Sequence, residues 1–392
     1  MGADAMRVGL GDTIQSVEDH EFYIHLSPLL VVEEFKRKLN YLVDKSFPSR
    51  AINIIFATDD SRELATHIAN RVGLDPSTAC LDINKFTVLN IEEDRPIVIV
   101  ADAVETGRSL QDISRQLRRL SSKVPLVYFI GVSKTSGEYG RESLKSTLAF
   151  AEGPAKHVVE IVHSIILPQF PGVHPWLQER RLLLNSDFQR CVDEESRGYF
   201  AQRLSVLSLS DSPLLDNLFV PNVEDGKLLL QPGFAFWKGN FSGRNEFSEA
   251  DVFFSIATVL QNARALGHSK NPGKVKFIRS NWLQQTLLDP QNFRRFDDSM
   301  IQASFLRAAH PRELNYSCSN ELSQKVHEFI LEEIDKSKSD VGSVCAELLL
   351  ALATQQLRLT QKHMTDLASV ENRDLAPITK ALLKFCQTQR SA

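Results

Sequence analysis

The chain has 392 residues and a mass of 44.1 kDa, enough for two domains that each bury a core. Its 43% hydrophobic and 24% charged residues are typical of globular proteins and argue against a largely disordered chain. The net charge of -4 gives no overall attraction to nucleic acid or anionic membranes. No run approaches the roughly 18 apolar residues of a membrane span. Residues 1–11 lack a signal-peptide core, and five scattered cysteines without zinc-ligand spacing indicate reduced thiols, so we expect a cytoplasmic protein.

The first elements can be predicted from apolar spacing and from helix boundaries. Residues 1–20 are polar and weakly patterned, which predicts a tail or an edge segment. An amphipathic helix is predicted from residue 27 to a point before Phe47-Pro48, because a serine-proline pair starts it and apolar residues recur at helical spacing through residue 42. A buried strand over 51–57 and a helix over 63–72, closed by Gly73, follow.

The segment 97–110 carries the clearest chemical pattern. Its first four residues are apolar and favour a strand buried on both faces, after which the chain becomes helical. Gly107 allows the backbone to approach a bound group, and Thr106 and Ser109 offer hydroxyl groups beside the first N–H groups of the helix. Asp102 is placed to accept hydrogen bonds from sugar hydroxyls or to hold a hydrated Mg²⁺. These groups together fit a ribose 5-phosphate.

Residues 97–109 resemble the signature of type I phosphoribosyltransferases: four apolar residues, two acids, two mostly apolar residues, then x-Thr-Gly-x-Ser/Thr. The pattern departs at Ala101, which replaces the first acid and removes one contact to the ribose diol. Glu105 stands where purine-type members, such as hypoxanthine-guanine phosphoribosyltransferase, often carry an aspartate proposed to transfer a proton. The resemblance implies that Glu105 and Asp102 are catalytic candidates and that Thr106, Gly107, Arg108 and Ser109 hold the 5-phosphate.

In that family the loop after the earlier strand wraps the pyrophosphate, usually with small residues. Two carboxylates at this place would repel pyrophosphate unless Mg²⁺, the cofactor that an active enzyme would need, bridges them. The alternative is structural: Asp60 or Ser61 caps the following helix and Asp59 is solvated. The loop consists of Thr58, Asp59, Asp60, Ser61 and Arg62, and no set of residues stands out as metal ligands.

The rest of this half predicts a parallel sheet. A third buried strand is predicted over 126–132, and Lys134 follows it where purine-type enzymes use a lysine to contact the base, although lysine at a strand end also serves solubility. A short hairpin over 80–89 and a strand over 158–167, with His163 as a core histidine, complete the pattern. Strands that alternate with helices predict a doubly wound, mostly parallel α/β sheet with its site at the carboxyl edge.

Two basic segments could be mistaken for nucleic-acid surfaces. Arg115, Arg118, Arg119 and Lys123 lie near the end of the helix after residue 108, where they complement the helix dipole, so we interpret them as a solvated face. Between 279 and 307 aromatic residues alternate with arginines, which could bind a nucleic acid strand. The spacing of aromatic residues 293 and 296 and the acids at 297 and 298 favour a helical core instead.

The second half is predicted to be mostly helical, without a catalytic motif of its own. Residues 347–352 are apolar on most sides, which predicts a helix buried in a bundle or at a subunit interface. Helical patterns cover 176–203, 246–267, 319–337, 341–366 and 376–389. The expected domains are an N-terminal tail (1–20), a phosphoribosyltransferase-like domain (21–185), a junction (186–245) and a helical module (246–392).

Three functions are compatible with these patterns. The leading hypothesis is a phosphoribosyltransferase-like protein that binds phosphoribosyl pyrophosphate or a nucleotide and, as an enzyme, would transfer or cleave at a ribosyl C1–N bond. The alternative is a lapsed enzyme that serves as a nucleotide sensor or as a scaffold with a protein partner on its C-terminal helices. Its layout resembles phosphoribosyltransferase-like subunits of bacterial antiphage systems, including some retrons. The third is a nucleic-acid-binding subunit.

Overall fold

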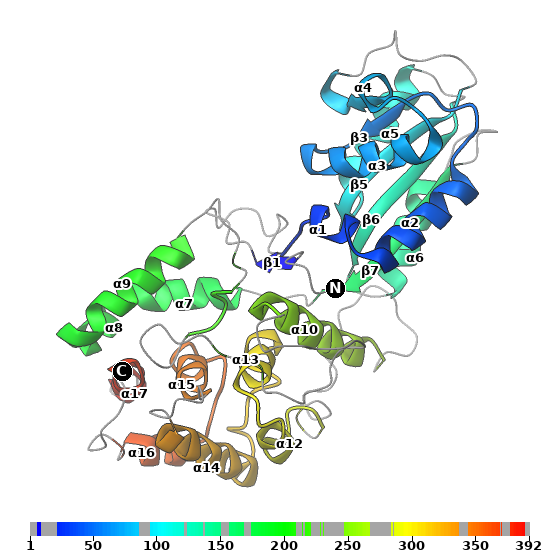
Figure 1. Cartoon of the computed structure of the whole chain (residues 1–392). Coiled ribbons are helices and arrows are strands. Elements are labelled where there is room, and N and C mark those ends of the chain that lie inside the picture. Colours follow the sequence, from blue (N-terminus) through cyan, green and yellow to red (C-terminus); the bar gives the residue numbers. More distant parts are fainter. Residues whose placement is uncertain are drawn as a thin grey trace. The chain divides into compact units, whose positions relative to one another are not determined.

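The computed structural model describes most of the chain in two compact units (Figure 1). The first unit runs from Ile24 to Leu167, and the second comprises residues 6–23 and 168–392. The domain boundaries expected at 185 and 245 stay predictions, although the contacts group the chain from Pro168 onward with the helices that follow. The described residues are 6–8, 22–85, 95–120, 124–135, 138–149, 157–167, 174–208, 214, 216–220, 228, 230, 247–266, 284, 286–336, 344–368, 370 and 377–388.

A five-stranded sheet organises the first unit. Every neighbouring pair of its strands is parallel, and the strand order is β4-β3-β5-β6-β7. From β3 the chain adds β4 on one side and then returns to add β5 on the other, so the strand order reverses between β3 and β5. The strands are β3 (Ile54–Phe56), β4 (Cys80–Asp82), β5 (Ile97–Val104), β6 (Leu126–Thr135) and β7 (Val158–Ile166).

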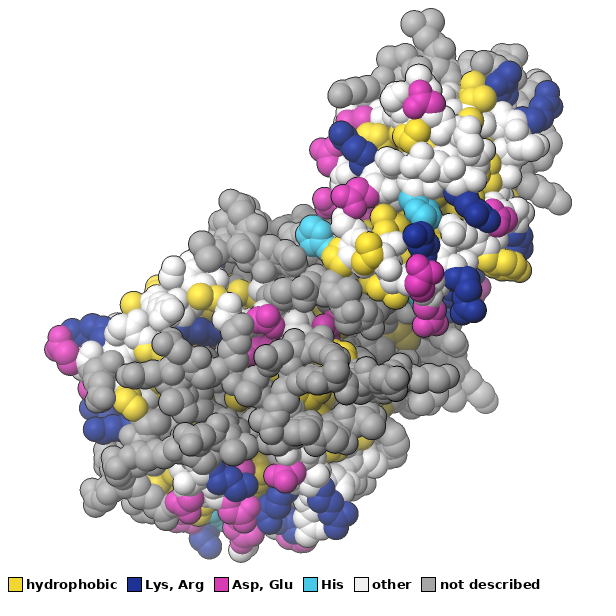
Figure 2. Space-filling view, viewed as in Figure 1, with side chains coloured by type: hydrophobic (Ala, Val, Ile, Leu, Met, Phe, Trp, Pro, Cys, Tyr) yellow, Lys and Arg dark blue, Asp and Glu magenta, His cyan; other side chains and the backbone are white. Residues whose placement is uncertain are grey.

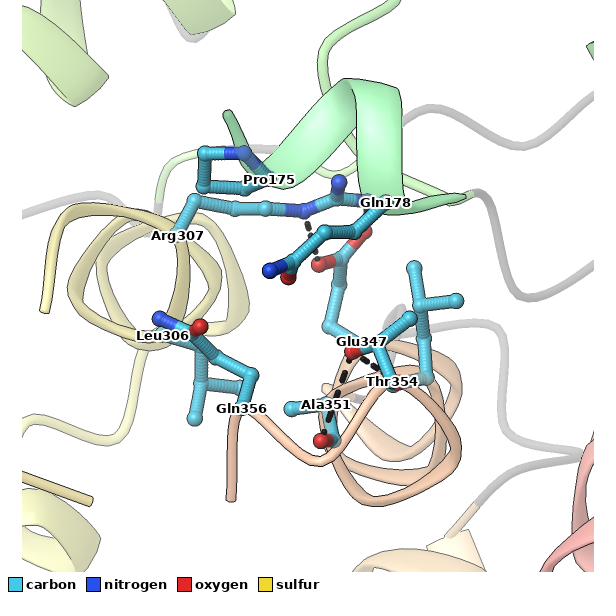
Figure 3. Close-up of a pocket in the computed structure, with 9 residues that line it drawn as sticks. Pro175, Gln178, Leu306, Arg307, Glu347, Ala351, Thr354 and Gln356 are labelled. Carbon is cyan, nitrogen blue, oxygen red and sulfur yellow. Dashed lines mark hydrogen bonds and ion pairs between the residues drawn. The ribbon is translucent and has the colours of Figure 1, made fainter. Parts of the chain in front are cut away.

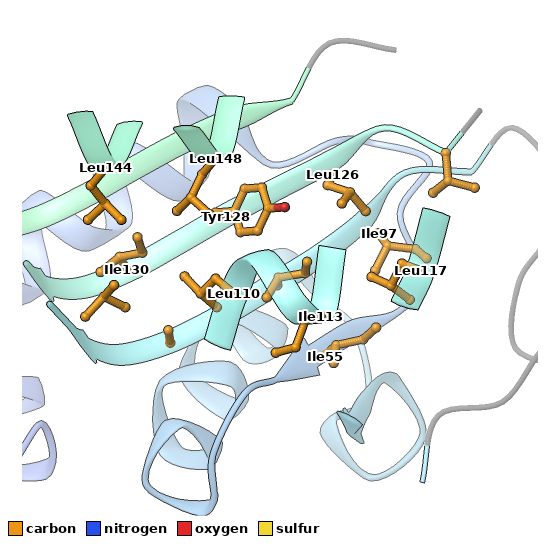
Figure 4. Close-up of a cluster of buried hydrophobic side chains, with 14 residues drawn as sticks. Ile55, Ile97, Leu110, Ile113, Leu117, Leu126, Tyr128, Ile130, Leu144 and Leu148 are labelled. Atoms are coloured by element: carbon orange, nitrogen blue, oxygen red, sulfur yellow. The ribbon is translucent and has the colours of Figure 1, made fainter. Parts of the chain in front are cut away.

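Both faces of this sheet are covered. On one face, the apolar stripes of α5 and α6 pack on alternate residues of the central strands, among them Ile99 and Tyr128 (Figure 4). Ile54, Val98 and Val100 do not belong to this cluster and are also fully buried, so the other face is covered as well. The helices of this unit are α1 (Ser27–Leu30), α2 (Glu33–Ser46), α3 (Arg62–Val72), α4 (Pro76–Ala79), α5 (Arg108–Leu120) and α6 (Glu138–Ala149), with 3-10 turns at Asp59–Ser61 and Ile83–Lys85. The predicted doubly wound α/β fold is confirmed.

One local prediction in this unit is wrong, and another lies partly outside the described residues. Of the hairpin predicted over 80–89, Cys80–Asp82 is a parallel edge strand beside β3 and a 3-10 turn follows it, while residues 86–89 lie outside the described part. The third strand does not end at 132 but runs to Thr135, so Lys134 lies inside β6 and is buried. A lysine that the sequence placed at a strand end is therefore a sheet residue facing the interior.

The second unit consists mainly of helices, as predicted, with a two-stranded sheet of β1 (Met6–Val8) and β2 (Phe22–Ile24). One predicted helix, 341–366, is two helices in the structure. The first helix ends after Ala353, where Gln355 adopts a left-handed φ of 58° and the Leu357 N–H donates back to the Ala351 carbonyl. The helices are α7 (Pro175–Leu184), α8 (Ser186–Cys191), α9 (Glu194–Ser208), α10 (Glu249–Leu266), α12 (Pro290–Arg295), α13 (Ser299–Ala308), α14 (Asn320–Lys336), α15 (Cys345–Ala353), α16 (Gln361–Ala368) and α17 (Pro377–Thr388).

The aromatic and arginine-rich segment forms core, as its spacing favoured. Phe293 and Phe305 are buried, and Phe293 meets Phe329 edge-on at 5.6 Å. Arg307 is 5% exposed and belongs to an internal ion network, so its charge is not available to a nucleic acid. Trp282 lies outside the described residues. All nine residues of α15 are buried, which confirms the predicted buried helix over 347–352.

The core of the second unit contains charged side chains that neutralise one another. The guanidinium of Arg203 binds both carboxylate oxygens of Glu179, at 2.7 and 3.1 Å. Arg307 binds Glu179 at 2.8 Å and both oxygens of Glu347 at 2.7 and 2.8 Å. These four residues come from α7, α9, α13 and α15, and all are less than 7% exposed. The network therefore ties together helices that are far apart in the sequence.

The same network holds an irregular backbone segment, residues 218–220, inside the unit. The Leu218 carbonyl accepts hydrogen bonds from Arg203 and from the indole of Trp176, at 2.9 and 2.7 Å. Glu347 accepts the Val220 N–H at 2.6 Å, and Glu249 of α10 accepts the N–H groups of Leu218 and Phe219. Charged side chains thus satisfy backbone groups that neither a helix nor a sheet would satisfy here.

Candidate functional site

The predicted site residues converge where the strand order reverses. In open α/β sheets the crevice for ligands lies at the carboxyl ends of the two strands on either side of such a point. The loop of residues 57–61 follows β3, and the loop of residues 105–107 follows β5. Lys134 comes from the neighbouring strand β6. Topology alone therefore brings together the three groups that the sequence singled out.

Asp102 connects the two loops across this point. Its carboxylate Oδ1 accepts hydrogen bonds from the hydroxyls of Ser61 and Thr58, at 3.0 and 3.3 Å. The Asp102 N–H in turn donates to Ser61 Oγ at 3.0 Å, and the two hydroxyls lie 2.7 Å apart. Ser61 is fully buried and makes no helix cap, so the capping alternative is wrong for this residue. Because Oδ1 is occupied, Oδ2 is the oxygen that could accept a ribose hydroxyl.

The charged residues of the first loop point toward solvent. Arg62 binds the Asp59 carboxylate at 2.8 Å, and these side chains are 57% and 83% exposed. The Arg62 guanidinium also lies over the ring of Phe56, 5.1 Å from its centre. Asp60 is exposed beside them. The arginine that could offset the two carboxylates is therefore already paired with one of them.

Ala101 lies in the apolar core on the face of β5 opposite to Asp102. Side chains alternate between the faces of a strand, so Ala101 and Asp102 point to opposite faces of β5. The Ala101 methyl is 3% exposed and belongs to the apolar cluster under α5. An acid at this position would be placed among Ile99, Ile130 and Leu110. The alanine therefore suits the packing of this unit and leaves Asp102 as the acid at the end of β5.

The turn into α5 contains a glycine with a left-handed φ. This glycine, Gly107, packs closely against α6, whereas the sequence suggested that it lets the backbone approach a bound group. Gly107 adopts a φ of 74°, and a Cβ on it would clash with Cδ1 of Leu144 in α6. The glycine is thus required by a left-handed turn and by close packing against α6. Thr106 Oγ1 accepts the Arg108 N–H at 3.4 Å, and Thr106, Arg108 and Ser109 are exposed. Two hydroxyls and a guanidinium accordingly surround the positive end of a 13-residue helix.

Lys134 places a buried ammonium beside these acids. Its Nζ lies 3.9 Å from Glu105 Oε2, and its side chain is 6% exposed while that of Glu105 is 52% exposed. Burial lowers the pKa of Lys134, and the carboxylates of Glu105 and Asp102 oppose that shift. The lysine thus contributes positive charge below a rim that Glu105 leaves open to solvent. Sequence reasoning identified both residues but did not predict that the lysine is buried.

A cavity in the helical unit is too small for a metabolite. It lies beside the Arg307–Glu347 ion pair, with Pro175 and Gln178 of α7 opposite Gln356 (Figure 3). Its volume of about 20 Å³ accommodates a single water molecule. We therefore assign it no ligand and locate the candidate site in the first unit.

The surface and the composition of the described residues add three observations. Acidic and basic side chains are interspersed on the face shown in Figure 2, which offers no extended basic patch there. Among the residues that the structure describes, no three His, Cys, Asp or Glu side chains are grouped as metal ligands. No described helix combines the length and the apolar character that crossing a bilayer requires.

Comparisons with known proteins give one distant structural neighbour to report. No family model matches the chain, and a search of curated proteins gives no significant match. The UMP synthase of Leishmania donovani is similar in structure, with 14% identical residues and a TM-score of 0.30. The similarity covers 52% of this chain and 40% of that one, so the chain spans less than half of the UMP synthase.

Proposed function

We propose that the first unit binds a phosphorylated ribose at the point between β3 and β5, and that it acts as a nucleotide-binding subunit without transferring the ribose. The exposed turn of Thr106, Arg108 and Ser109 at the start of α5 is the observation that carries this proposal. Backbone N–H groups at a helix start favour an anion, and the two hydroxyls and the guanidinium add donors.

The surrounding charges support a ribose next to that phosphate. Oδ1 of Asp102 is held by Ser61 and Thr58, so Oδ2 is the oxygen to which a ribose hydroxyl can donate. The Lys134 ammonium reduces the repulsion that Glu105 and Asp102 would exert on a phosphate. Asp102 can thus contact the sugar of a nucleoside monophosphate, and the turn at 106–109 its phosphate.

Two departures favour binding over transfer. Transfer from phosphoribosyl pyrophosphate requires the leaving pyrophosphate to be held and its charge to be neutralised. The first loop instead presents Asp59 and Asp60, and the single arginine beside them, Arg62, can offset at most one of these two charges. Ala101 lies in the apolar core, which removes the second acid from the ribose side. Two groups that transfer would require are therefore missing: a loop that neutralises the leaving pyrophosphate, and a second acid beside the ribose.

Transfer at the C1–N bond is the second candidate, supported by the Glu105–Lys134 pair. In that case Glu105 would act as general acid or base, Lys134 would contact the base, and Mg²⁺ would bridge pyrophosphate to the loop of Asp59 and Asp60. A partner protein on the C-terminal helices, as in the antiphage assemblies that the layout resembles, is compatible with either function and stays a prediction.

Thermal unfolding in the presence of ligands tests the binding proposal. Ribose 5-phosphate and adenosine monophosphate should each raise the melting temperature of the full chain at millimolar concentration. The double variant Thr106→Val with Ser109→Ala should lose this shift, whereas Ser146→Ala, which changes an exposed serine of α6, should keep it. Absence of a shift in the unaltered protein would eliminate the proposal.

A turnover assay separates binding from transfer. Phosphoribosyl pyrophosphate and Mg²⁺ are incubated with a panel of purine and pyrimidine bases, and pyrophosphate release is followed. We expect binding without release. Release that depends on a base and is abolished in Glu105→Gln would instead establish the transfer function.

A further inference from the structure

A polar pocket lies between α5 and α6, over the first half of β6. Its volume is about 170 Å³, close to the roughly 150 Å³ of a cavity that holds benzene, so a small molecule fits. It shares no lining residue with the candidate site at the start of α5. Its polar lining consists of Gln111, Ser114, Arg115 and Arg118 of α5, Tyr128 of β6 and Thr147 of α6.

The α5 residues reach the pocket because of their spacing. Positions 111, 114, 115 and 118 recur every three or four residues and therefore lie on one side of the helix. The adjacent stripe, Leu110, Ile113 and Leu117, packs on the sheet. The arginines that the sequence assigned to a solvated face thus lie along the edge of α5 that borders α6.

The pocket carries positive charge. Arg118 has no carboxylate within ion-pair distance among the described residues, and its Nε donates only a long bond, 3.4 Å, to the Ser114 carbonyl. The charge of Arg118 contributes, after burial, to a lowered pKa of His157. Arg115 binds Asp112 at 2.6 Å, but these side chains are 60% and 61% exposed, where an ion pair contributes little. An entering anion could therefore recruit both guanidinium groups.

A buried hydroxyl without a hydrogen-bond partner lines the same pocket. Tyr128 is fully buried between Leu126 and Leu148 (Figure 4), and its hydroxyl oxygen has no partner in the described part of the chain. Ser114 lies close enough to lower the pKa of Tyr128, but without hydrogen-bond geometry. Burial outweighs this effect and raises the pKa, so the hydroxyl keeps its proton at neutral pH. A buried donor of this kind is rare unless something else satisfies it.

We propose that this pocket binds a phosphate group, either as inorganic phosphate or on a small phosphomonoester. All six polar side chains can donate hydrogen bonds, and both arginines can do so in the bidentate geometry that suits phosphate oxygens. A phosphate offers oxygens in four directions, which serves donors from α5, α6 and the sheet together. A carboxylate has fewer acceptor sites and would leave part of this set unused.

Calorimetric titration of the full chain with inorganic phosphate and with glycerol 3-phosphate tests the proposal. Arg118→Gln should weaken this binding about tenfold or more, because it removes a charged hydrogen bond. Tyr128→Phe should weaken it several-fold, and in the absence of phosphate it should unfold at the same or a higher temperature, because it removes a buried unsatisfied group. Arg115→Gln and Thr147→Val, both at exposed positions, give the same test without disturbing the core.

Two controls decide which site binds. The double variant Thr106→Val with Ser109→Ala should still bind phosphate in this pocket. If the double variant loses phosphate binding while Arg118→Gln keeps it, the phosphate binds at the start of α5. The inference then fails, while the proposed function stands. Malonate is the competing ligand. Tighter binding of malonate than of phosphate, equal affinity in all pocket variants, or no heat at 10 mM phosphate (roughly the weakest binding that a specific site would give) would each overturn the proposal.

Discussion

The two units treat buried polar atoms in opposite ways. The sheet of the first unit packs against α5 and α6 mainly through aliphatic and aromatic side chains, with Ser114 and the Tyr128 hydroxyl as isolated buried polar groups and Lys134 at the edge of that face. The second unit buries two arginines and two glutamates in one network and places a further glutamate, Glu249, against backbone N–H groups. The comparison teaches where each unit is vulnerable. An apolar core tolerates gradual changes of volume, whereas a charge network fails when one member is lost.

Removal of one charge from the network should have the largest effect. Glu347→Gln leaves Arg307 with a single carboxylate partner in the core and should destabilise the second unit by about 3 to 5 kcal/mol. All three tryptophans, at 176, 237 and 282, belong to that unit, so tryptophan fluorescence in urea reports on it alone. Glu321→Gln, which breaks the exposed pair with Lys325, is the control and should change little. A loss of unfolding free energy below about 1 kcal/mol for Glu347→Gln would show that the buried charge network is no more sensitive than an exposed ion pair.

In the first unit, Gly107→Ala should have the next largest effect. The substitution forces a Cβ into a left-handed turn and against Leu144, which should reduce stability by about 3 kcal/mol. Gly73→Ala has a similar φ of 77° but no atom within 4 Å of the new Cβ, so about 1 kcal/mol is expected. Hydrogen exchange of the β5 and β6 amides measures both. Equal effects would mean that contact with α6 contributes nothing.

The buried Glu249 makes the second unit sensitive to pH. Burial raises its pKa to about 7, so between pH 4.5 and 7 the folded state holds a proton that the unfolded state has lost. Stability from this group therefore falls as the pH rises through that interval, by on the order of 2 kcal/mol. In Glu249→Gln this contribution disappears. The unfolding free energy of the variant minus that of the original protein should therefore increase from pH 4.5 to 7, because only the original loses stability over this interval.

His174 and His310 titrate in the opposite sense, which makes the difference measurement necessary. Burial lowers their pKa values to about 3 and about 4, so their contributions rise with pH. Both proteins share these histidines, so their effects cancel in the difference. A constant difference across this pH range would show that Glu249 is ionised throughout.

The smallest effect is expected at the hydroxyl that joins the loops of the first unit. Ser61→Ala removes the bonds to the carboxylate and to the N–H of Asp102 and should reduce stability by about 1 to 2 kcal/mol. Exchange should accelerate locally, in residues 57–62, without global unfolding. Thr58→Val, which loses the 3.3 Å bond to Asp102 and the bond to the Ser61 hydroxyl but leaves both bonds between Ser61 and Asp102, is the graded control. If both variants affect exchange equally, Ser61 has no special part in fixing Asp102.

The sequence predicted the sheet well because its central strands carry an unambiguous signal. β5, β6 and β7 are long apolar runs, and a parallel arrangement follows from the helices between them. The parallel pairing of β4 with β3 was not predicted because three half-buried residues carry no period, and a turn near Gln355 split a helix that its composition presented as continuous. Local patterns predict long elements well and leave the pairing of short ones open.

Contacts over long sequence distances explain what could not be predicted at the candidate site. The position of Asp102 and the turn at 106–109 followed from one local motif. Ser61 lies 41 residues from Asp102, and nothing in the loop sequence distinguishes a serine that binds a distant acid from one that caps its own helix. Glu179, Arg203, Arg307 and Glu347 look equally like surface charges in sequence, because only the packing of four helices brings them together.

The network of α7, α9, α13 and α15 also sets an order of events during synthesis. The first unit is complete at residue 167 and can fold while the ribosome is still translating the helices. Arg307 emerges before Glu347, so a nascent chain that ends short of α15 would have to bury an arginine without its second carboxylate. We expect the helical unit to close only after α15 has left the ribosome, and truncated chains to be degraded or to require chaperones.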